Sequence, residues 1–127
     1  MTLLSKQTCS ACDASATKKR VPLHQSEVVE LLRKLLAQSP SSDSWLLVEE
    51  QGIQKLNCQF VTKRYKNSML FVNQIAELAE SVNHHPLMVV EYGQVGIQWW
   101  SHNIKGLDQN DFIMAAKTSA LFAEMKI

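Results

Sequence analysis

The spacing of apolar residues changes repeatedly along this 127-residue chain, and this change constrains the fold more than any single motif does. Three segments, at about residues 27–38, 65–82 and 109–125, repeat apolar residues every three or four positions, which is typical of amphipathic helices. Between them, residues 45–61 and 87–100 form short β-branched and aromatic runs around glycine, which are typical of β-hairpins. The predicted order is helix, hairpin, helix, hairpin, helix.

This order predicts an α+β fold: a four-stranded antiparallel sheet with helices packed on one face, in the order α-β-β-α-β-β-α. The first hairpin is expected to turn at Gln51-Gly52. In its second strand, Leu56, Cys58 and Phe60 alternate with polar residues. One face of the sheet is therefore expected to be buried and the other to be largely wet.

Capping residues predict where two of the helices begin. Ser26 is placed to cap a first helix that starts at Glu27. Asp108 can cap the last helix, with Asp111 three residues further on in a capping-box arrangement. Asp111 therefore has a structural explanation beside any functional one. The buried stripe of this last helix is expected to consist of Phe112, Ala115, Ala116, Ser119 and Ala123.

The length of the chain predicts a single domain. Residues 1–22 show little apolar periodicity and end at Pro22, so they are expected to form a flexible leader outside the core. The folded domain is then expected to span residues 23–127. An open sheet leaves unpaired edge strands, so a homodimer or homotetramer is also expected.

Charge and cysteine content exclude several classes of protein. The formal net charge is +1 and no long run has one sign, so there is no electrostatic footprint for nucleic acid or an anionic membrane. No apolar run approaches the ~20 residues of a membrane span, and the N-terminus lacks the apolar core of a secretory signal. Three cysteines, an odd number, fit a reducing compartment. We expect a cytoplasmic protein without nucleic-acid or membrane partners.

Two cysteines near the N-terminus have the spacing of half a zinc site. They are Cys9 and Cys12. Cys58 lies inside a predicted strand and His24 stands alone, so no second close-spaced pair completes a tetrahedron. We expect no structural metal.

Three of the four histidines, His84, His85 and His102, mark the candidate site. The unperturbed imidazole pKa of about 6.5 makes such a group a candidate for proton transfer or for metal binding. Pro86 disfavours helix at His85, so the pair is expected at a half-exposed rim between a helix and a strand. The following hairpin folds His102 back towards His84. Zinc remains an alternative, but neighbouring histidines point apart in an extended segment and no HExxH motif is present.

Other residue types narrow the chemistry of this site. Glu80 lies one helical turn before His84 and either faces it or is a solvated acid at the end of the helix. No serine lies in a GxSxG motif, so no activated nucleophile is visible. Tyr92, Trp99 and Trp100 are candidates for the floor of a partly apolar pocket, with alternate residues facing in. Proton transfer by imidazole to a flat heterocycle fits this composition.

The spacing of these residues resembles the signature of the pterin-4a-carbinolamine dehydratases. The matching positions are Glu80, three residues, His84-His85-Pro86, five residues, Tyr92, nine residues, His102, eight residues and Asp111. The likeness extends more thinly over about residues 24–125, and the segment WWSHNIKGLDQNDFIMAAK is similar to the bacterial members. Asn83 departs from the vertebrate members, which carry an aspartate at this position.

The resemblance implies a hydro-lyase that removes water from 4a-hydroxytetrahydrobiopterin, or a related pterin, to give quinonoid dihydropterin. It implies no metal and no organic cofactor. It also implies a functional link to an aromatic amino acid hydroxylase, such as a phenylalanine hydroxylase, whose pterin would be recycled. Vertebrate members of the family also act as the dimerisation partner of a homeodomain transcription factor, so a protein-binding transcriptional coregulator is the alternative.

The resemblance also implies roles for individual residues. His84 and His102 would be the acid and base groups, and His85 would orient the pterin or share in proton transfer. Asp111 would orient a nearby histidine and favour its charged form. Glu80 would do likewise or meet the amino-pyrimidine edge of the ring. The implied substrate-binding residues are Glu80, Asn83, Pro86, Ser101 and Asn103.

Overall fold

The computed structural model describes residues 3–8, 21–38 and 44–125. A short 3-10 helix, η1 (Leu4–Lys6), comes first. The other elements in chain order are α1 (Gln25–Gln38), β1 (Leu46–Glu50), β2 (Ile53–Val61), α2 (Tyr65–Val82), β3 (Leu87–Val90), β4 (Gln94–Trp99) and α3 (Gln109–Glu124). From α1 onward the predicted order of elements is confirmed.

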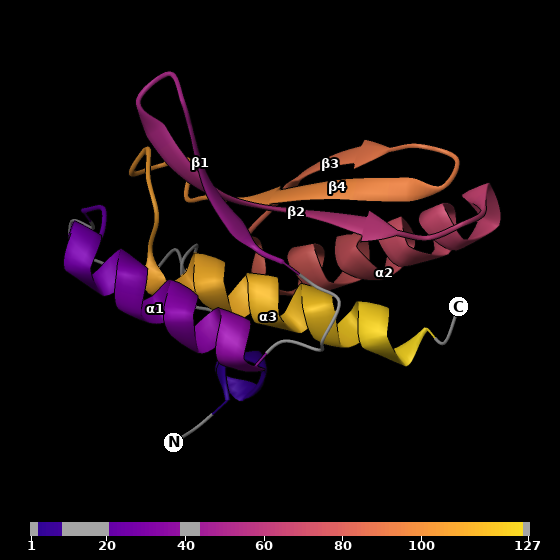
Figure 1. Ribbon diagram of the computed structural model, residues 1–127, viewed down its shortest axis with the longest axis horizontal. Coiled ribbons are helices and arrows are strands. Elements are labelled where there is room, and N and C mark those ends of the chain that lie inside the picture. Colours follow the sequence, from indigo (N-terminus) through magenta and orange to yellow (C-terminus); the bar gives the residue numbers. More distant parts are fainter. Residues whose placement is uncertain (1–2, 9–20, 39–43, 126–127) are drawn as a thin grey trace.

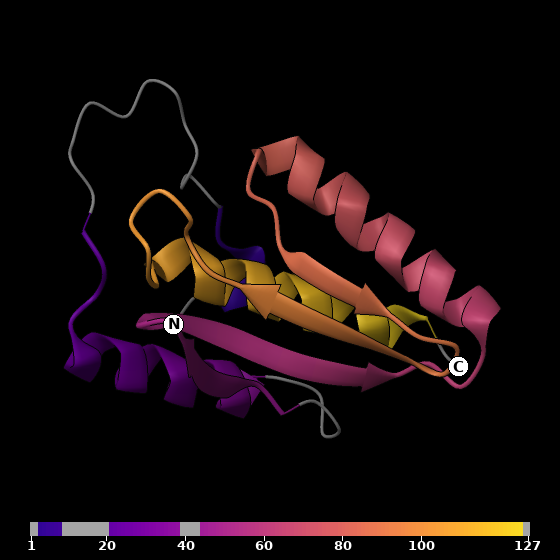
Figure 2. The same cartoon turned by 90° about the horizontal axis from the view of Figure 1, so that it is seen from above.

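The strands form one four-stranded antiparallel sheet in the order β1-β2-β4-β3. Its hairpins are β1–β2 and β3–β4, and β2 and β4 pair in the middle, so β1 and β3 are the edges. The three α-helices lie on one face of the sheet (Figure 1). Seen from above, α3 runs behind the strands, between α1 and α2 (Figure 2). The predicted fold class is confirmed.

Alternation along β2 decides which side chains face the helices. Leu56, Cys58 and Phe60 are buried, as predicted. Their partners across the ladder to β4 are also buried: Trp99, Ile97 and Val95. Because successive side chains in a strand point to opposite faces, Lys55 and Trp100 belong to the other, outer face. Trp99 and Trp100 therefore face opposite sides of the sheet.

Helix α3 supplies hydrogen-bond partners for two buried tryptophans of the sheet layer. Nε1 of Trp45 donates to Oγ of Ser119 at 2.8 Å, and Nε1 of Trp99 donates to Oγ1 of Thr118 at 3.0 Å. Buried indole groups need such partners, so these polar residues on α3 are part of the core. Four residues of the predicted stripe of α3 are buried: Phe112, Ala115, Ala116 and Ser119.

The predicted stripe of α3 is wrong at Ala123, which is exposed. In this last turn Phe122 takes the inward position, because its ring packs against Phe60 and Phe71 at centroid distances of 4.9 and 5.2 Å. In the last turn of α3 the large side chain of Phe122, and not the small one of Ala123, therefore packs in the aromatic cluster.

Two predicted boundaries shift by one or two residues. Helix α1 begins at Gln25, so Ser26 lies inside its first turn rather than at its cap, and the carbonyl of His24 accepts the first helical hydrogen bonds. Strand β1 begins at Leu46 rather than at Trp45. The predicted turn at Gln51-Gly52 is confirmed, and both residues have positive φ angles, of 54° and 78°.

The prediction that residues 1–22 lie outside the core is wrong for Leu4, which is 2% exposed. The amide of Leu4 donates to Oε1 of Gln38, and Nζ of Lys117 donates to the carbonyl of Ser5. Segment η1 therefore links the C-terminal end of α1 to the middle of α3. Residues 9–20, with Cys9 and Cys12, lie outside the described residues, as do residues 39–43 of the predicted turn after the first helix.

Candidate active site

The two adjacent histidines diverge because of the way α2 ends. Asn83 caps this helix in the left-handed conformation, with φ 53° and ψ 42°, which asparagine tolerates better than most residues. The amide of His84 then donates to the carbonyl of Ala79 at 3.1 Å. As a result His84 points inward and is 3% exposed, whereas the side chain of His85 is 50% exposed. The predicted rim position holds for His85 and is wrong for His84.

The carboxylate of Asp111 contacts the imidazole of His84. Its Oδ1 lies 2.7 Å from Nε2 of His84, and its side chain is fully buried. Its Oδ2 accepts hydrogen bonds from Oγ of Ser101 at 2.8 Å and from the amide of Asp108 at 2.9 Å. The predicted capping box is confirmed. Asp111 therefore caps α3 and contacts the histidine with the same carboxylate.

Trp99 packs against the imidazole of His84. The two rings stack with a centroid distance of 5.4 Å and an interplanar angle of 29°. Ser101 donates to the carboxylate of Asp111 rather than to an imidazole, which differs from the order Ser-His-Asp that activates a serine. The geometry therefore supports an oriented imidazole and gives no support for acyl transfer.

A second carboxylate contacts His85. Oε1 of Glu80 lies 2.8 Å from Nε2 of His85, and both side chains are largely exposed. Of the two alternatives that spacing left open for Glu80, the contact with His84 is not formed, because the left-handed turn at Asn83 rotates His84 into the core and leaves His85 over the last turn of α2. The carboxylate of Glu80 and the imidazole of His85 are therefore both open to a ligand.

His102 lies at the end of the sheet, on the outer face that Trp100 also faces. Its ring packs against Trp100 at a centroid distance of 4.3 Å, and Nζ of Lys55 lies 4.2 Å from the centroid of the Trp100 ring. The hairpin brings His102 to the same end of the sheet as His84, since Ser101 bonds to Asp111. The two imidazoles nevertheless pack on neighbouring tryptophans that face opposite sides.

The remaining predicted residues divide into two groups. Tyr92 is 70% exposed in the turn between β3 and β4, at the far end of β3 from His85, so it does not floor the histidine site. Asn83 and Asn103 are exposed and Pro86 is half-buried, which leaves all three open to a ligand. Ser101 is buried, and its amide donates to the carbonyl of Gly106 at 2.9 Å.

Residues 3–8, 21–38 and 44–125 contain neither a candidate metal cluster nor a candidate membrane span. No group of three or more histidine, cysteine or acidic side chains there is arranged to hold a metal ion. Within the same ranges, no helix has the length and apolar character needed to cross a membrane. Cys58, the cysteine that the structure describes, is buried in β2.

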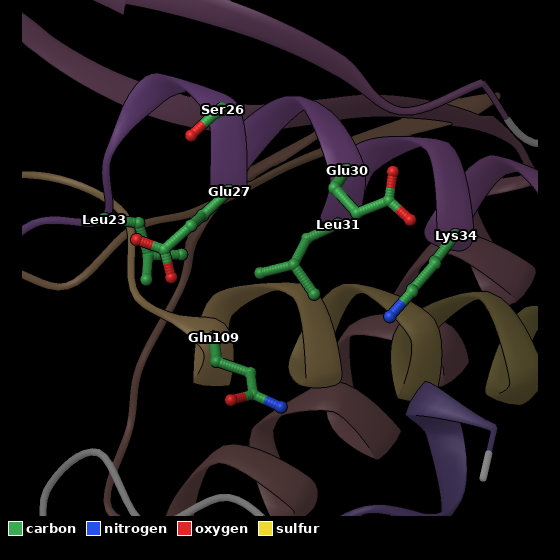
Figure 3. A pocket seen from close by; sticks show the side chains of 7 residues that line it. All are labelled: Leu23, Ser26, Glu27, Glu30, Leu31, Lys34 and Gln109. Atoms are coloured by element: carbon green, nitrogen blue, oxygen red, sulfur yellow. The ribbon is translucent and has the colours of Figure 1, made fainter. Parts of the chain in front are cut away.

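A separate pocket of about 390 Å³ lies between α1 and the start of α3 (Figure 3). It is lined by Leu23, Ser26, Glu27, Glu30, Leu31, Lys34 and Gln109. Glu30 is paired with Arg33 at 2.6 Å, and this hydrogen bond holds the pKa of the Glu30 carboxyl below its ordinary value. None of the histidines lines this pocket, so it is distinct from the histidine site.

Comparison with known proteins identifies the family of this chain and agrees with its fold. The chain belongs to the Pterin 4 alpha carbinolamine dehydratase family, whose family model matches residues 21–121. It is 41% identical over 122 residues to a Saccharophagus degradans protein named "Putative pterin-4-alpha-carbinolamine dehydratase", covering 96% of this chain and 98% of that protein. A Vibrio cholerae protein with the same name is 43% identical over 119 residues, covering 94% of this chain and 99% of that protein.

A solved structure also resembles this chain. It is described as the crystal structure of a transcriptional coactivator/pterin dehydratase from Brucella melitensis. The two share 29% sequence identity with a TM-score of 0.66, and the match covers 79% of this chain and 97% of the Brucella chain. The likeness therefore includes nearly the whole of that domain.

Proposed function

We propose that this protein dehydrates 4a-hydroxytetrahydropterin to quinonoid dihydropterin. One observation carries the proposal: in a chain of this family, three histidines gather at one end of the sheet, and each contacts a carboxylate or an aromatic ring. Such contacts restrict how an imidazole can turn. Oriented imidazoles are suited to a reaction in which one proton transfer assists cleavage of a carbon–oxygen bond and another removes a proton from the ring.

The reaction needs a proton delivered to the leaving hydroxyl and another removed from a ring nitrogen. Imidazole can perform both tasks near neutral pH. Neither transfer requires a metal or an organic cofactor. The substrate is flat and partly apolar, and the indole of Trp100 beside His102 offers a surface of matching character.

Within this proposal His84 and His102 are the acid and base groups. The buried carboxylate of Asp111 orients His84, and Trp100 packs against His102. His85 orients the pterin or shares in proton transfer, and Glu80 holds its ring through the 2.8 Å contact.

The proposed pterin contacts follow from exposure. Asn83, Pro86 and Asn103 keep this role, together with Glu80. Ser101 receives a different one, because its hydroxyl and its amide both bond within the protein, to Asp111 and Gly106. We propose that Ser101 supports the carboxylate rather than the substrate.

The proposal extends to cellular context. The product would return to the pterin cofactor of an aromatic amino acid hydroxylase, such as a phenylalanine hydroxylase. The odd number of cysteines fits a reducing cytoplasm, and the open sheet with two edge strands fits a homodimer or homotetramer. The Pterin 4 alpha carbinolamine dehydratase family supports the reaction class, and the resemblance to that family implies the link to a hydroxylase. The cytoplasmic location and the association are inferred from the chain itself.

The direct test is dehydration of freshly generated 4a-hydroxytetrahydropterin, followed by ultraviolet absorbance with and without the protein. We expect a rate well above the spontaneous one and unaffected by a chelator. A rate equal to the spontaneous one would refute the proposed activity.

A second candidate function rests on the Brucella structure, whose description also names a transcriptional coactivator. We infer from it that a protein-binding role on the same fold is the alternative. The two candidates separate in the dehydration assay, because a binding module alone would leave the spontaneous rate unchanged. Activity and a second, protein-binding role are compatible with each other.

A further inference from the structure

On the outer face of the sheet, Lys55 and His102 both contact the ring of Trp100. Nζ of Lys55 lies 4.2 Å from the centroid of the Trp100 ring, and the ring of His102 packs on the same indole at 4.3 Å. The side chain of Lys55 is 13% exposed, and its ammonium lies 3.6 Å from Oε1 of Glu50. An ammonium over an indole is attracted by the ring quadrupole.

The strand register explains why these residues meet. Leu56 pairs with Trp99, so continuing the register by one position places Lys55 level with Trp100. His102 follows Trp100 by two residues in the turn after β4, and its ring packs against the same indole.

We propose that Trp100 is a positioning residue for His102, and that Lys55 fixes the Trp100 ring through the cation–π contact. This inference rests on the proposed dehydratase function. His102 lies in a turn after the end of β4 and is exposed, so the turn alone restricts its ring less than a packed core would. The indole supplies the missing restraint, and Lys55, anchored by Glu50, keeps the indole in place.

The kinetic effects of substitutions at Trp100 and Lys55 distinguish a positioning role from a general structural role. Trp100→Leu should lower kcat about tenfold to hundredfold, because a misplaced proton donor or acceptor slows the chemical step. KM should rise much less, through loss of the aromatic surface beside the pterin. Trp100→Phe, which keeps an aromatic ring, should recover most of the loss. Lys55→Met should lower kcat less than Trp100→Leu does. Lys66→Met, which changes an exposed lysine on α2, is the matched control and should retain full activity.

The decisive variant combines Trp100→Leu with His102→Ala. If Trp100 acts through His102, the double variant should be no slower than His102→Ala alone, since coupled residues are not additive. Losses that multiply would overturn the proposal, and so would a rise in KM with kcat unchanged.

A measurement without substrate separates this inference from the proposed function. In a ¹H–¹³C spectrum the ring protons of His102 should be shifted by the Trp100 ring current, and Trp100→Leu should remove that shift. If Trp100→Leu loses the shift but keeps full activity, the positioning role is overturned. An inactive wild type with the shift present would refute the dehydratase function while confirming the stack, and an unshifted His102 would refute the stack itself.

Discussion

Nε2 of His84 lies 2.7 Å from Oδ1 of Asp111, and neither side chain is more than 3% exposed. This contact ties the end of α2 to the first turn of α3, because Asp111 also belongs to the capping box with Asp108. One carboxylate therefore serves both the fold and the site. Its replacement should affect both.

Asp111→Ala is expected to lower the free energy of unfolding by about 2–5 kcal/mol, because it removes the acceptor of several buried hydrogen bonds at once. The activity of the remaining folded protein should also fall. Asp108→Ala, the matched control, removes the other half of the capping box and should cost about 0.5–2 kcal/mol while retaining most activity. Urea unfolding and the dehydration assay measure the two effects. Equal behaviour of the two variants would show that Asp111 only caps the helix.

Leu4 should contribute to stability although it lies in the segment predicted as a leader. Leu4→Ala is expected to lower the free energy of unfolding by about 2–5 kcal/mol, as for other buried leucines. Leu3→Ala is the matched control, since Leu3 is 48% exposed, and it should change stability by less than about 0.5 kcal/mol. A thermal melt of both variants checks this prediction. Identical melting temperatures would show that η1 detaches freely in solution.

The sequence predicted the fold well because the relevant signals are local. The 3.6-residue spacing between Tyr65 and Val82 matches α2 to the residue, and alternation through Leu56 and Phe60 identified the buried face. Leu4 was missed because one buried leucine in a three-residue helix produces no periodic pattern.

The site was harder to predict, because its contacts depend on features that spacing does not encode. A single left-handed residue, Asn83, decides that Glu80 contacts His85 and that His84 is buried. The contact of Lys55 with Trp100 depends on the register between β2 and β4, which are separated in the chain by α2 and β3. Histidine spacing therefore located the site without giving its pairs.

Association should involve the outer face and the edges of the sheet. This face exposes four apolar side chains, Leu46, Val61, Leu87 and Val89, and the strands β1 and β3 have unpaired edges. We expect sedimentation at micromolar concentration to show a dimer or tetramer. Val89→Lys on the edge strand β3 should shift the distribution towards monomer, whereas Val29→Lys on α1 should not. A monomeric wild type would contradict this prediction.

Glu80 should matter for turnover and not for stability. Glu80→Ala removes the carboxylate that holds His85, so kcat is expected to fall about tenfold through loss of orientation. Because both side chains are largely exposed, the pair should contribute at most about 1 kcal/mol to folding. Glu77→Ala, one turn earlier on α2 and also exposed, is the control and should behave as wild type. An unchanged kcat in Glu80→Ala would remove Glu80 from the site.

His102 gives the sharpest test of the mechanism, because it has no adjacent imidazole that could replace it. As an acid or base group it should contribute about 10²–10⁴-fold to kcat, the usual range for general acid–base catalysis, so His102→Ala should lose that factor. Substrate affinity should fall much less. The melting temperature should stay close to that of wild type, because the side chain is exposed.

The outcomes for His102→Ala separate three roles. A raised KM with kcat retained would show that His102 only binds substrate, since that pattern marks the loss of uniform binding. A lowered melting temperature would show a structural role instead. His24→Ala, at the exposed start of α1, is the matched histidine control and should keep full activity. Full activity in both His102→Ala and His84→Ala would refute imidazole catalysis here, because these are the two groups to which the proton transfers are assigned.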